Sequence, residues 1–350
     1  MAELRWNPLL KDWVMVASHR QNRPQMPKDW CPFCPGSGKV PEEYEVLKYD
    51  NDFPALMENP PEPDKVGSNV NQENLGTGIE KLGAGVENSG TGIYKTNRAY
   101  GKCEVILYSP KHTVTLPELS VEHIRKLVDL WCERYTELSK DKKIKYIFKF
   151  ENRGEEVGVT MPHPHGQIYA YSKMPLKIKT ELESCREYYE KNNECLICRM
   201  NKEEEEFKKR IIVENSSFVA YLPFFTDYPY GMFIVSKNHK SAMIHFTDEE
   251  KNDFADILKK VTGTFDALFN KKFPYMMCIH QAPVNSPEYG NYNDYYHFHV
   301  EFYTPLRSEN KIKYYASSEM GAWAACNPRA VEECAEELRE AYKRYLKNCK

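Results

Sequence analysis

The chain has 350 residues, of which 41% are hydrophobic and 28% are charged, the balance of an ordinary folded protein. At about 150 residues per domain, this length predicts two domains or one large α/β unit, whose core forms without disulfide or metal staples. The 48 basic and 51 acidic residues give a formal net charge of −3, which argues against nucleic acid as a partner.

The N-terminal residues and the apolar runs bear on location. Residues 1–6 carry neither a basic segment nor an apolar one, so we expect no secretory signal and a cytoplasmic protein. No run approaches the roughly 18 consecutive apolar residues of a membrane helix, so we expect no membrane partner. The 11 cysteines are an odd number in a chain without an export signal, which argues against a disulfide framework.

The first chemical signal along the chain is the C-x2-C pair Cys31 and Cys34. Such a pair is typical of a metal hook, with a redox pair as the alternative. Further on, within residues 67–96, paired glycines recur every seven residues. Glycine at that density cannot hold a helix, and no strand leads into the segment as a phosphate loop requires. We interpret residues 67–96 as a mobile insert.

Three helices are predicted by their caps and by the spacing of apolar residues. Ser120 can cap a helix whose apolar residues recur at three and four along residues 124–138. Residues 247–250 form a capping box before a matching stripe at 254–268. The Asn-Pro pair at 327–328 predicts the cap and the first position of the last helix. These stripes indicate packing surfaces rather than ligand contacts.

The same order of elements occurs in both halves of the chain. Each half reads as a C-x2-C pair, two strands of which the second leads to a histidine, a helix, a strand, and a strand that carries H-x-H. The corresponding residues are Cys31, Cys34, His112 and His163 in the first half, and Cys195, Cys198, His239 and His297 in the second. We interpret this as a tandem duplication with copies at 1–175 and 176–350. Each copy is expected to be an α+β unit, an antiparallel sheet with a long helix on one face.

The densest signal is the stretch His163-Pro-His165-Gly-Gln167. Zinc takes four nitrogen and sulfur ligands in tetrahedral structural sites, and Cys31, Cys34, His112 and His163 can supply such a set. That assignment leaves His165 for another task. A neutral imidazole can attack an electrophile while its other nitrogen is held by a carbonyl group, so His165 is the candidate nucleophile.

Residues 162–168, with Phe150-Glu-Asn-Arg-Gly154 upstream, resemble the galactose-1-phosphate uridylyltransferases, a family of the histidine-triad superfamily. The resemblance runs nearly end to end and implies a duplicated histidine-triad-like unit. It places a nucleotide-contacting segment at residues 51–53 and a sugar-binding loop around Lys313 and Glu319. The substrate-binding residues that it implies are Arg20, Arg23, Asn51, Asp52, Asn152, Gly158, Thr160, Gln167, Lys313 and Glu319.

The activity that the resemblance implies is a ping-pong exchange. His165 would attack the α-phosphorus of UDP-glucose, expel glucose 1-phosphate and hold UMP until galactose 1-phosphate takes it. Gln167 stands where hydrolases of the superfamily carry a third histidine. An amide can donate a hydrogen bond to a phosphoryl oxygen without delivering a proton to a leaving group, which favours a transferase.

The second C-x2-C pair leaves two ligand sets open for a second metal. The repeat indicates Cys195, Cys198, His239 and His297, whereas members of the family with a late metal site imply Glu181, His280, His297 and His299. Both sets need His297, so we expect them to exclude each other, and we favour the thiolate set because thiolates bind zinc strongly. We therefore expect two Zn²⁺ ions per chain, with iron as the alternative in the second site.

Two other functions and the assembly complete the expectations. A nucleotide-sugar phosphorylase acting on ADP-glucose would use the same histidine, and a zinc-stabilised nucleotide-binding protein would use none. The segment around Glu319 favours the uridylyltransferase over the phosphorylase, and the intact motif around His165 disfavours the non-catalytic reading. In the family the C-terminal loop reaches the neighbouring subunit, so the resemblance also implies a homodimer with shared active sites.

Overall fold

The computed structural model describes residues 2–22, 30–64 and 92–348. Residues 67–91 of the predicted insert and the predicted substrate ligand Arg23 lie outside the described residues. None of the helices in the described part of the chain combines the length and the apolarity that crossing a membrane requires.

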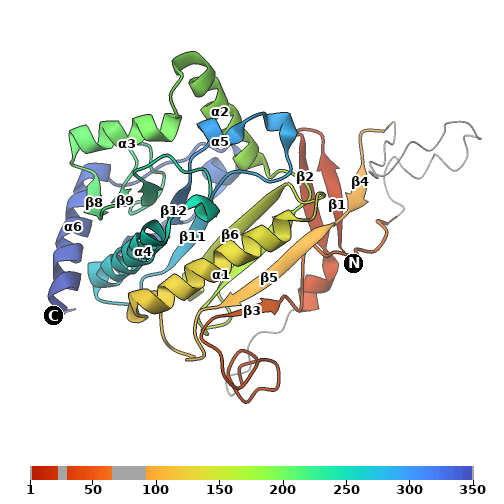
Figure 1. Cartoon of the computed structure of the whole chain (residues 1–350), viewed down its shortest axis with the longest axis horizontal. Coiled ribbons are helices and arrows are strands. Elements are labelled where there is room, and N and C mark those ends of the chain that lie inside the picture. The colour runs from red at the N-terminus through yellow and green to blue at the C-terminus, as the bar shows by residue number, and fades with distance from the viewer. Residues whose placement is uncertain (1, 23–29, 65–91, 349–350) are drawn as a thin grey trace, which may run out of the picture.

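A nine-stranded antiparallel sheet runs through both halves of the chain (Figure 1). Its order is β3-β5-β7-β6-β11-β12-β10-β9-β8. The strands are, from one edge to the other, β3 Leu47–Asp50, β5 Gly101–Leu107, β7 His165–Tyr171, β6 Tyr146–Arg153, β11 Tyr275–His280, β12 His299–Tyr303, β10 Phe233–Ser236, β9 Phe218–Tyr221 and β8 Ile211–Glu214. The α+β class is confirmed, and the sheets of the two halves are joined into one where β6 pairs with β11.

Smaller elements lie around this sheet. Strands β1 Ala2–Asn7, β2 Asp12–Ala17 and β4 Thr96–Arg98 form a three-stranded sheet, and β13 Leu306–Ser308 pairs with β14 Lys311–Ile312. Four α-helices of the described chain lie around the sheet besides the two long ones described below. They are α2 Leu176–Asn192, α3 Leu196–Phe207, α5 Tyr292–Tyr295 and α6 Val331–Asn348. A short 3₁₀-helix, η1 Ser18–Asn22, follows β2.

Two long helices, α1 Val121–Ser139 and α4 Asp248–Phe269, lie side by side on one face of the sheet (Figure 1). The Ser120 hydroxyl accepts a hydrogen bond from the His123 N–H at 3.2 Å. Thr247 and Glu250 exchange the two hydrogen bonds of a capping box at 2.8 and 3.1 Å. The apolar stripes of both helices are buried against the sheet, so both predicted helices are confirmed.

The predicted start of the last helix is wrong. Helix α6 begins at Val331, three residues after Pro328. The Asn327 side chain accepts from the Arg329 N–H at 3.0 Å and donates to the carbonyl oxygens of Thr226 at 3.0 Å and Tyr228 at 3.3 Å. These bonds tie the segment into a turn against the 226–228 loop, which delays the helix.

Alternation along β7 divides the two faces of the sheet. Ile168 and Ala170 pack into the core under α1 and α4. Because neighbouring side chains of a strand point to opposite faces, His165, Gln167 and Tyr169 lie on the other face. The candidate site therefore occupies the face that α1 and α4 leave uncovered.

Lys149 on β6 is a charged side chain in the helix-side core. It is 1% exposed, and its Nζ has no hydrogen-bond partner among the described residues. The Nζ lies 4.7 Å from the ring centre of Tyr135, and burial lowers the pKa of Lys149 to about 7. The apolar surroundings thus leave the amine only about half protonated at neutral pH.

We expect the Lys149→Met protein to be more stable than the wild type by about 1–3 kcal/mol at pH 7, because an unpaired polar group leaves the core. Between pH 7 and about 10.5 the unfolded chain binds the Lys149 proton and the folded chain does not, so wild-type stability rises with pH across that window. The advantage of Lys149→Met should shrink accordingly. Urea unfolding at several pH values checks this, and an advantage that grew with pH would contradict it.

Candidate metal centres and active site

Cys31, Cys34, His112 and His163 converge at one end of β5 and β7, as the sequence predicts. The Sγ of Cys34 lies 3.4 Å from Nδ1 of His112, and Nδ1 of His163 lies 3.7 and 3.6 Å from the two sulfur atoms. The four ligand atoms all lie within 4.8 Å of one another. Zinc bonds of about 2.3 Å to sulfur and about 2.0 Å to nitrogen give tetrahedral S–N edges of about 3.5 Å, so this set fits the ion.

The other nitrogen of His163 shows how the ring is oriented. Its Nε2 donates to the Ser109 carbonyl oxygen at 2.8 Å, so Nδ1 presents its lone pair to the two sulfur atoms. Burial lowers the pKa of His163 to about 4, which keeps the ring in the neutral form that binds metal. Ligand and orienting carbonyl are thus both in place.

The second half repeats this arrangement at Cys195, Cys198, His239 and His297. The Sγ of Cys198 lies 3.5 Å from Nδ1 of His239, and Nδ1 of His297 lies 3.7 and 3.3 Å from the two sulfur atoms. The His297 Nε2 donates to the Ser236 carbonyl oxygen at 2.9 Å. These four ligand atoms also lie within 4.8 Å of one another.

A third cluster of possible ligands, Glu181, His280, His299 and Glu301, lies next to the second cysteine set. The Glu181 carboxylate is 2.9 Å from Nδ1 of His280, and Glu301 is 3.5 Å from His280 and 3.6 Å from His299. The Nζ of Lys177 is 2.6 Å from Glu301, so the ammonium group of Lys177 forms an ion pair with one carboxylate of this cluster.

The two candidate clusters do not share His297 in this structure. Glu301 lies beside Glu181, His280 and His299, whereas His297 lies with Cys195, Cys198 and His239. Glu301 is not among the ligands expected from the sequence. Its position, two residues after His299 as Gln167 follows His165, was the available signal.

His165 is the first residue of β7, and its ring is oriented by the backbone. Nδ1 donates to the His163 carbonyl oxygen at 2.8 Å, which sets the ring tautomer and places the lone pair on Nε2. Gln167 follows two positions later on the same face. Between them, a Cβ on Gly166 would lie 2.4 Å from the Tyr108 hydroxyl, so only glycine fits at this place in the motif.

A cavity of about 290 Å³ lies beside His165 and includes Asn152 and Thr160, two of the predicted substrate ligands. Arg153 and Lys272 also line the cavity and bring positive charge. Burial raises the pKa of Glu151, which forms part of the wall, to about 7, so this carboxyl is partly protonated at neutral pH. Glu155 also lines the cavity, so its wall combines two cationic side chains with two carboxyl groups, of which Glu151 is the one partly protonated. Gly158 is not part of its lining and follows the short helix Glu155–Val157 with φ +78°.

The remaining predicted substrate ligands lie on three separate segments. Arg20 on η1 donates to the Tyr169 hydroxyl at 2.9 Å. Asn51 and Asp52 follow β3, and Asp52 accepts from the Tyr49 hydroxyl at 3.0 Å. Lys313 and Glu319 form an ion pair of 3.0 Å after β14, and neither lines the cavity beside His165. The structure thus brings Asn152 and Thr160 to His165 and leaves Lys313 and Glu319 outside that cavity.

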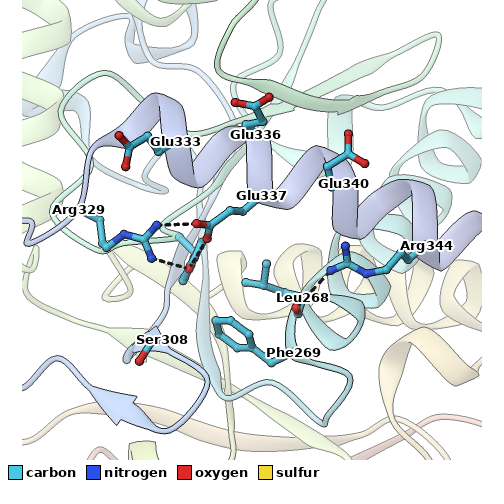
Figure 2. A pocket seen from close by; sticks show the side chains of 10 residues that line it. Leu268, Phe269, Ser308, Arg329, Glu333, Glu336, Glu337, Glu340 and Arg344 are labelled. Atoms are coloured by element: carbon cyan, nitrogen blue, oxygen red, sulfur yellow. Dashed lines mark hydrogen bonds and ion pairs between the residues drawn. The ribbon is translucent and has the colours of Figure 1, made fainter.

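Figure 2 shows a larger open cavity, of about 570 Å³, between α6 and the C-terminal end of α4. Glu333, Glu336 and Glu340 line it from α6. The Arg329 guanidinium pairs with Glu337 at 2.6 Å, and Arg344 donates to backbone carbonyl oxygens. Its carboxylates outnumber its cations, so it does not suit a phosphorylated ligand.

Comparison with known proteins gives consistent results along the chain. Residues 1–175 match the family model described as galactose-1-phosphate uridyl transferase, N-terminal domain, and residues 181–343 match that of the C-terminal domain. The chain is 40% identical to a galactose-1-phosphate uridylyltransferase of Thermotoga maritima over 97% of this chain and 98% of the relative. The corresponding Haemophilus influenzae protein is 32% identical, with coverages of 96% and 93%.

Comparison with solved structures also indicates a uridylyltransferase fold. One described as a uridylyltransferase superposes with a TM-score of 0.83 at 30% identity, covering 98% of this chain and 99% of that one. An Arabidopsis thaliana ADP-glucose phosphorylase with bound ADP-glucose reaches 0.70 at 23% identity, covering 97% and 99%, and shows the shared fold.

Proposed function

Because the chain belongs to the galactose-1-phosphate uridylyltransferase family, we propose that His165 carries UMP between UDP-glucose and galactose 1-phosphate. The chain is thus an enzyme, a uridylyltransferase of galactose metabolism. The observation that supports His165 most directly is the hydrogen bond of its Nδ1 to the His163 carbonyl oxygen, which places the lone pair on Nε2, the nitrogen that a nucleophilic attack requires.

The proposed exchange has two balanced steps. Nε2 of His165 attacks the α-phosphorus of UDP-glucose, a P–N bond forms, and the P–O bond to glucose 1-phosphate breaks. The phosphate oxygen of galactose 1-phosphate then attacks the same phosphorus, the P–N bond breaks, and UDP-galactose leaves. The proton on Nδ1 stays on that nitrogen throughout, hydrogen-bonded to the His163 carbonyl oxygen. The Gln167 amide donates to a phosphoryl oxygen, so no proton is delivered to the leaving group.

The cavity beside His165 supports a phosphorylated substrate. Arg153 is fixed by an ion pair with Asp266 at 2.8 Å, so its charge is held at the wall. Lys272 adds a second cation at the rim, where it donates to the Thr113 carbonyl oxygen at 3.1 Å. Asn152 and Thr160 offer neutral hydrogen bonds to phosphoryl oxygens. We assign the hexose phosphate of each substrate to this cavity, and Arg20, Asn51 and Asp52 to the nucleotide with its α-phosphate.

We further propose that the two cysteine–histidine sets each hold one Zn²⁺, with iron as the alternative in the second. The repeated distances between sulfur and nitrogen atoms support this. Bound zinc would hold the loop before each H-x-H segment, as a structural site does. Thiolate ligands must stay reduced, which suits a cytoplasmic enzyme. The same repetition supports copies at 1–175 and 176–350.

One incubation tests the function. The protein is mixed with labelled UDP-glucose or ADP-glucose, followed by galactose 1-phosphate or inorganic phosphate. We expect labelled UDP-galactose when UDP-glucose is the donor and galactose 1-phosphate is the acceptor. Turnover of ADP-glucose with phosphate instead would favour the phosphorylase, and no turnover with any pair would favour a binding protein.

The position of Lys313 and Glu319 supports a homodimer with shared sites. Both residues belong to the second half, they pair with each other, and neither lines the cavity beside His165. We propose that this loop enters the active site of a second copy, where Lys313 and Glu319 contact the hexose.

Complementation checks the shared site. Homodimers of His165→Gly and of Glu319→Ala should both have little activity. A co-refolded mixture contains heterodimers with one complete site, and random pairing gives about a quarter of wild-type activity. Absence of recovery, with heterodimers demonstrated by a tag on each variant, would exclude the shared site.

A further inference from the structure

We propose that Tyr169 is a positioning residue that holds Arg20 over β7 for contact with the diphosphate of UDP-glucose. The inference rests on the proposed function and extends it, because Tyr169 itself touches no reacting atom. It acts through the guanidinium of Arg20.

The first step is the placement of Tyr169 on the strand of the nucleophile. His165, Gln167 and Tyr169 share one face of β7, about 7 Å apart in succession along the strand. β7 is an inner strand, since Cys103 of β5 and Phe148 of β6 pair with Tyr169 from its two sides. The phenol is therefore held in a fixed relation to the nucleophile on the same strand.

The second step is the rigidity of the ring. Tyr169 is 7% exposed, and its ring meets that of Phe150 edge-on at 5.1 Å between centres. The ring of Tyr171 lies 6.1 Å away. A ring packed in this way holds its hydroxyl in one place. The side chain of Arg20, by contrast, projects from the one-turn helix η1 and would otherwise sample many rotamers.

The third step is charge. Nη1 of Arg20 donates to the Tyr169 hydroxyl at 2.9 Å. This partner is a neutral phenol, so the bond orients the guanidinium without cancelling its charge. A guanidinium has several further N–H donors and pairs with phosphate in a planar, two-bond geometry. An oriented guanidinium on the face of His165, with no carboxylate partner among the residues that the structure describes, fits the diphosphate of a nucleotide sugar.

A double-mutant cycle on the full chain tests this coupling, with the rate of His165 uridylylation by UDP-glucose as the readout. Tyr169→Phe keeps the ring and removes the acceptor, and we expect kcat/KM for this half-reaction to fall about tenfold. In an Arg20→Ala background the same change should have no further effect. Tyr171→Phe is the matched control, since it removes a phenol from the same face that does not bind Arg20, and it should leave the rate unchanged.

Each outcome decides one proposal. An equal loss from Tyr169→Phe in both backgrounds, or no loss in either, would overturn the positioning role, and thermal unfolding with zinc content identifies a variant that has lost its fold. Comparing the uridylylation rates of Arg20→Lys and Arg20→Ala gives a second test. Lysine keeps the charge but lacks the planar guanidinium, so it should recover only part of the rate if orientation matters. Failure of the wild type to form any adduct would contradict the proposed function itself, which separates the two.

Discussion

The His165→Gly protein should lose UMP transfer by a factor of about 10⁴–10⁶, the range for removal of a catalytic nucleophile. Mixing wild-type protein with UDP-glucose alone should add the mass of one UMP to the intact chain. Acid should release it, because a phosphoramidate is acid-labile. The variant lacks the imidazole that would form the P–N bond, so no covalent UMP should form.

The second half of the chain supplies the control for this experiment. His299 begins β12 as His165 begins β7, and its Nδ1 lies 3.0 Å from the His297 carbonyl oxygen. Its Nε2, however, lies 3.6 Å from the Glu301 carboxylate, which repels an anionic phosphate. His299→Gly should therefore retain the adduct. An adduct that persisted on His165→Gly would show that another residue is the nucleophile.

Replacing both Cys31 and Cys34 by alanine should remove one zinc equivalent and abolish formation of the UMP adduct. A structural zinc site contributes apparent binding free energies of about 10–16 kcal/mol in small domains, so its loss disorders the surrounding loop. This loop affects the proposed reaction because His163 has two contacts. Its side chain is a candidate metal ligand, and its backbone carbonyl oxygen accepts the hydrogen bond that orients His165. Metal analysis by mass spectrometry and the intact-mass assay give the two readouts.

The equivalent change at Cys195 and Cys198 is the matched comparison. It should also remove one metal equivalent, and the same measurement identifies zinc or iron. Because the oriented ring in that half is His299, the adduct on His165 should still form. Unchanged metal content in this variant, with a loss in Glu181→Ala instead, would contradict the thiolate site and favour the carboxylate–histidine cluster.

Features set by neighbouring residues could be predicted from the sequence. The Ser120 cap and the capping box at Thr247 depend on residues three positions apart, and both are present. The two cysteine–histidine sets span more than a hundred residues each, yet the internal repeat specified them, because each half served as a template for the other.

Features that depend on tertiary contacts could not be predicted from the sequence. Asn327 has the right chemistry for a helix cap, but its amide binds the 226–228 loop instead, and no local pattern shows that competitor. Glu301 joins His280 only because β11 and β12 pair in a particular register. The hydrogen bond from Arg20 to Tyr169 joins residues 149 positions apart with no motif between them.

The pairing of β6 with β11 protects each half of the chain from aggregation. These strands lie inside the sheet, and each would become an open edge if the halves were separated. An exposed edge of that length, with aromatic side chains such as Phe148 and Phe150, is a template for aggregation. A half-length chain of this architecture could cover that edge by pairing with a second copy of itself, edge to edge across a twofold axis. Tandem duplication makes this association permanent within one polypeptide, and it frees the two copies to diverge, so that one keeps Gln167 beside its histidine and the other carries Glu301.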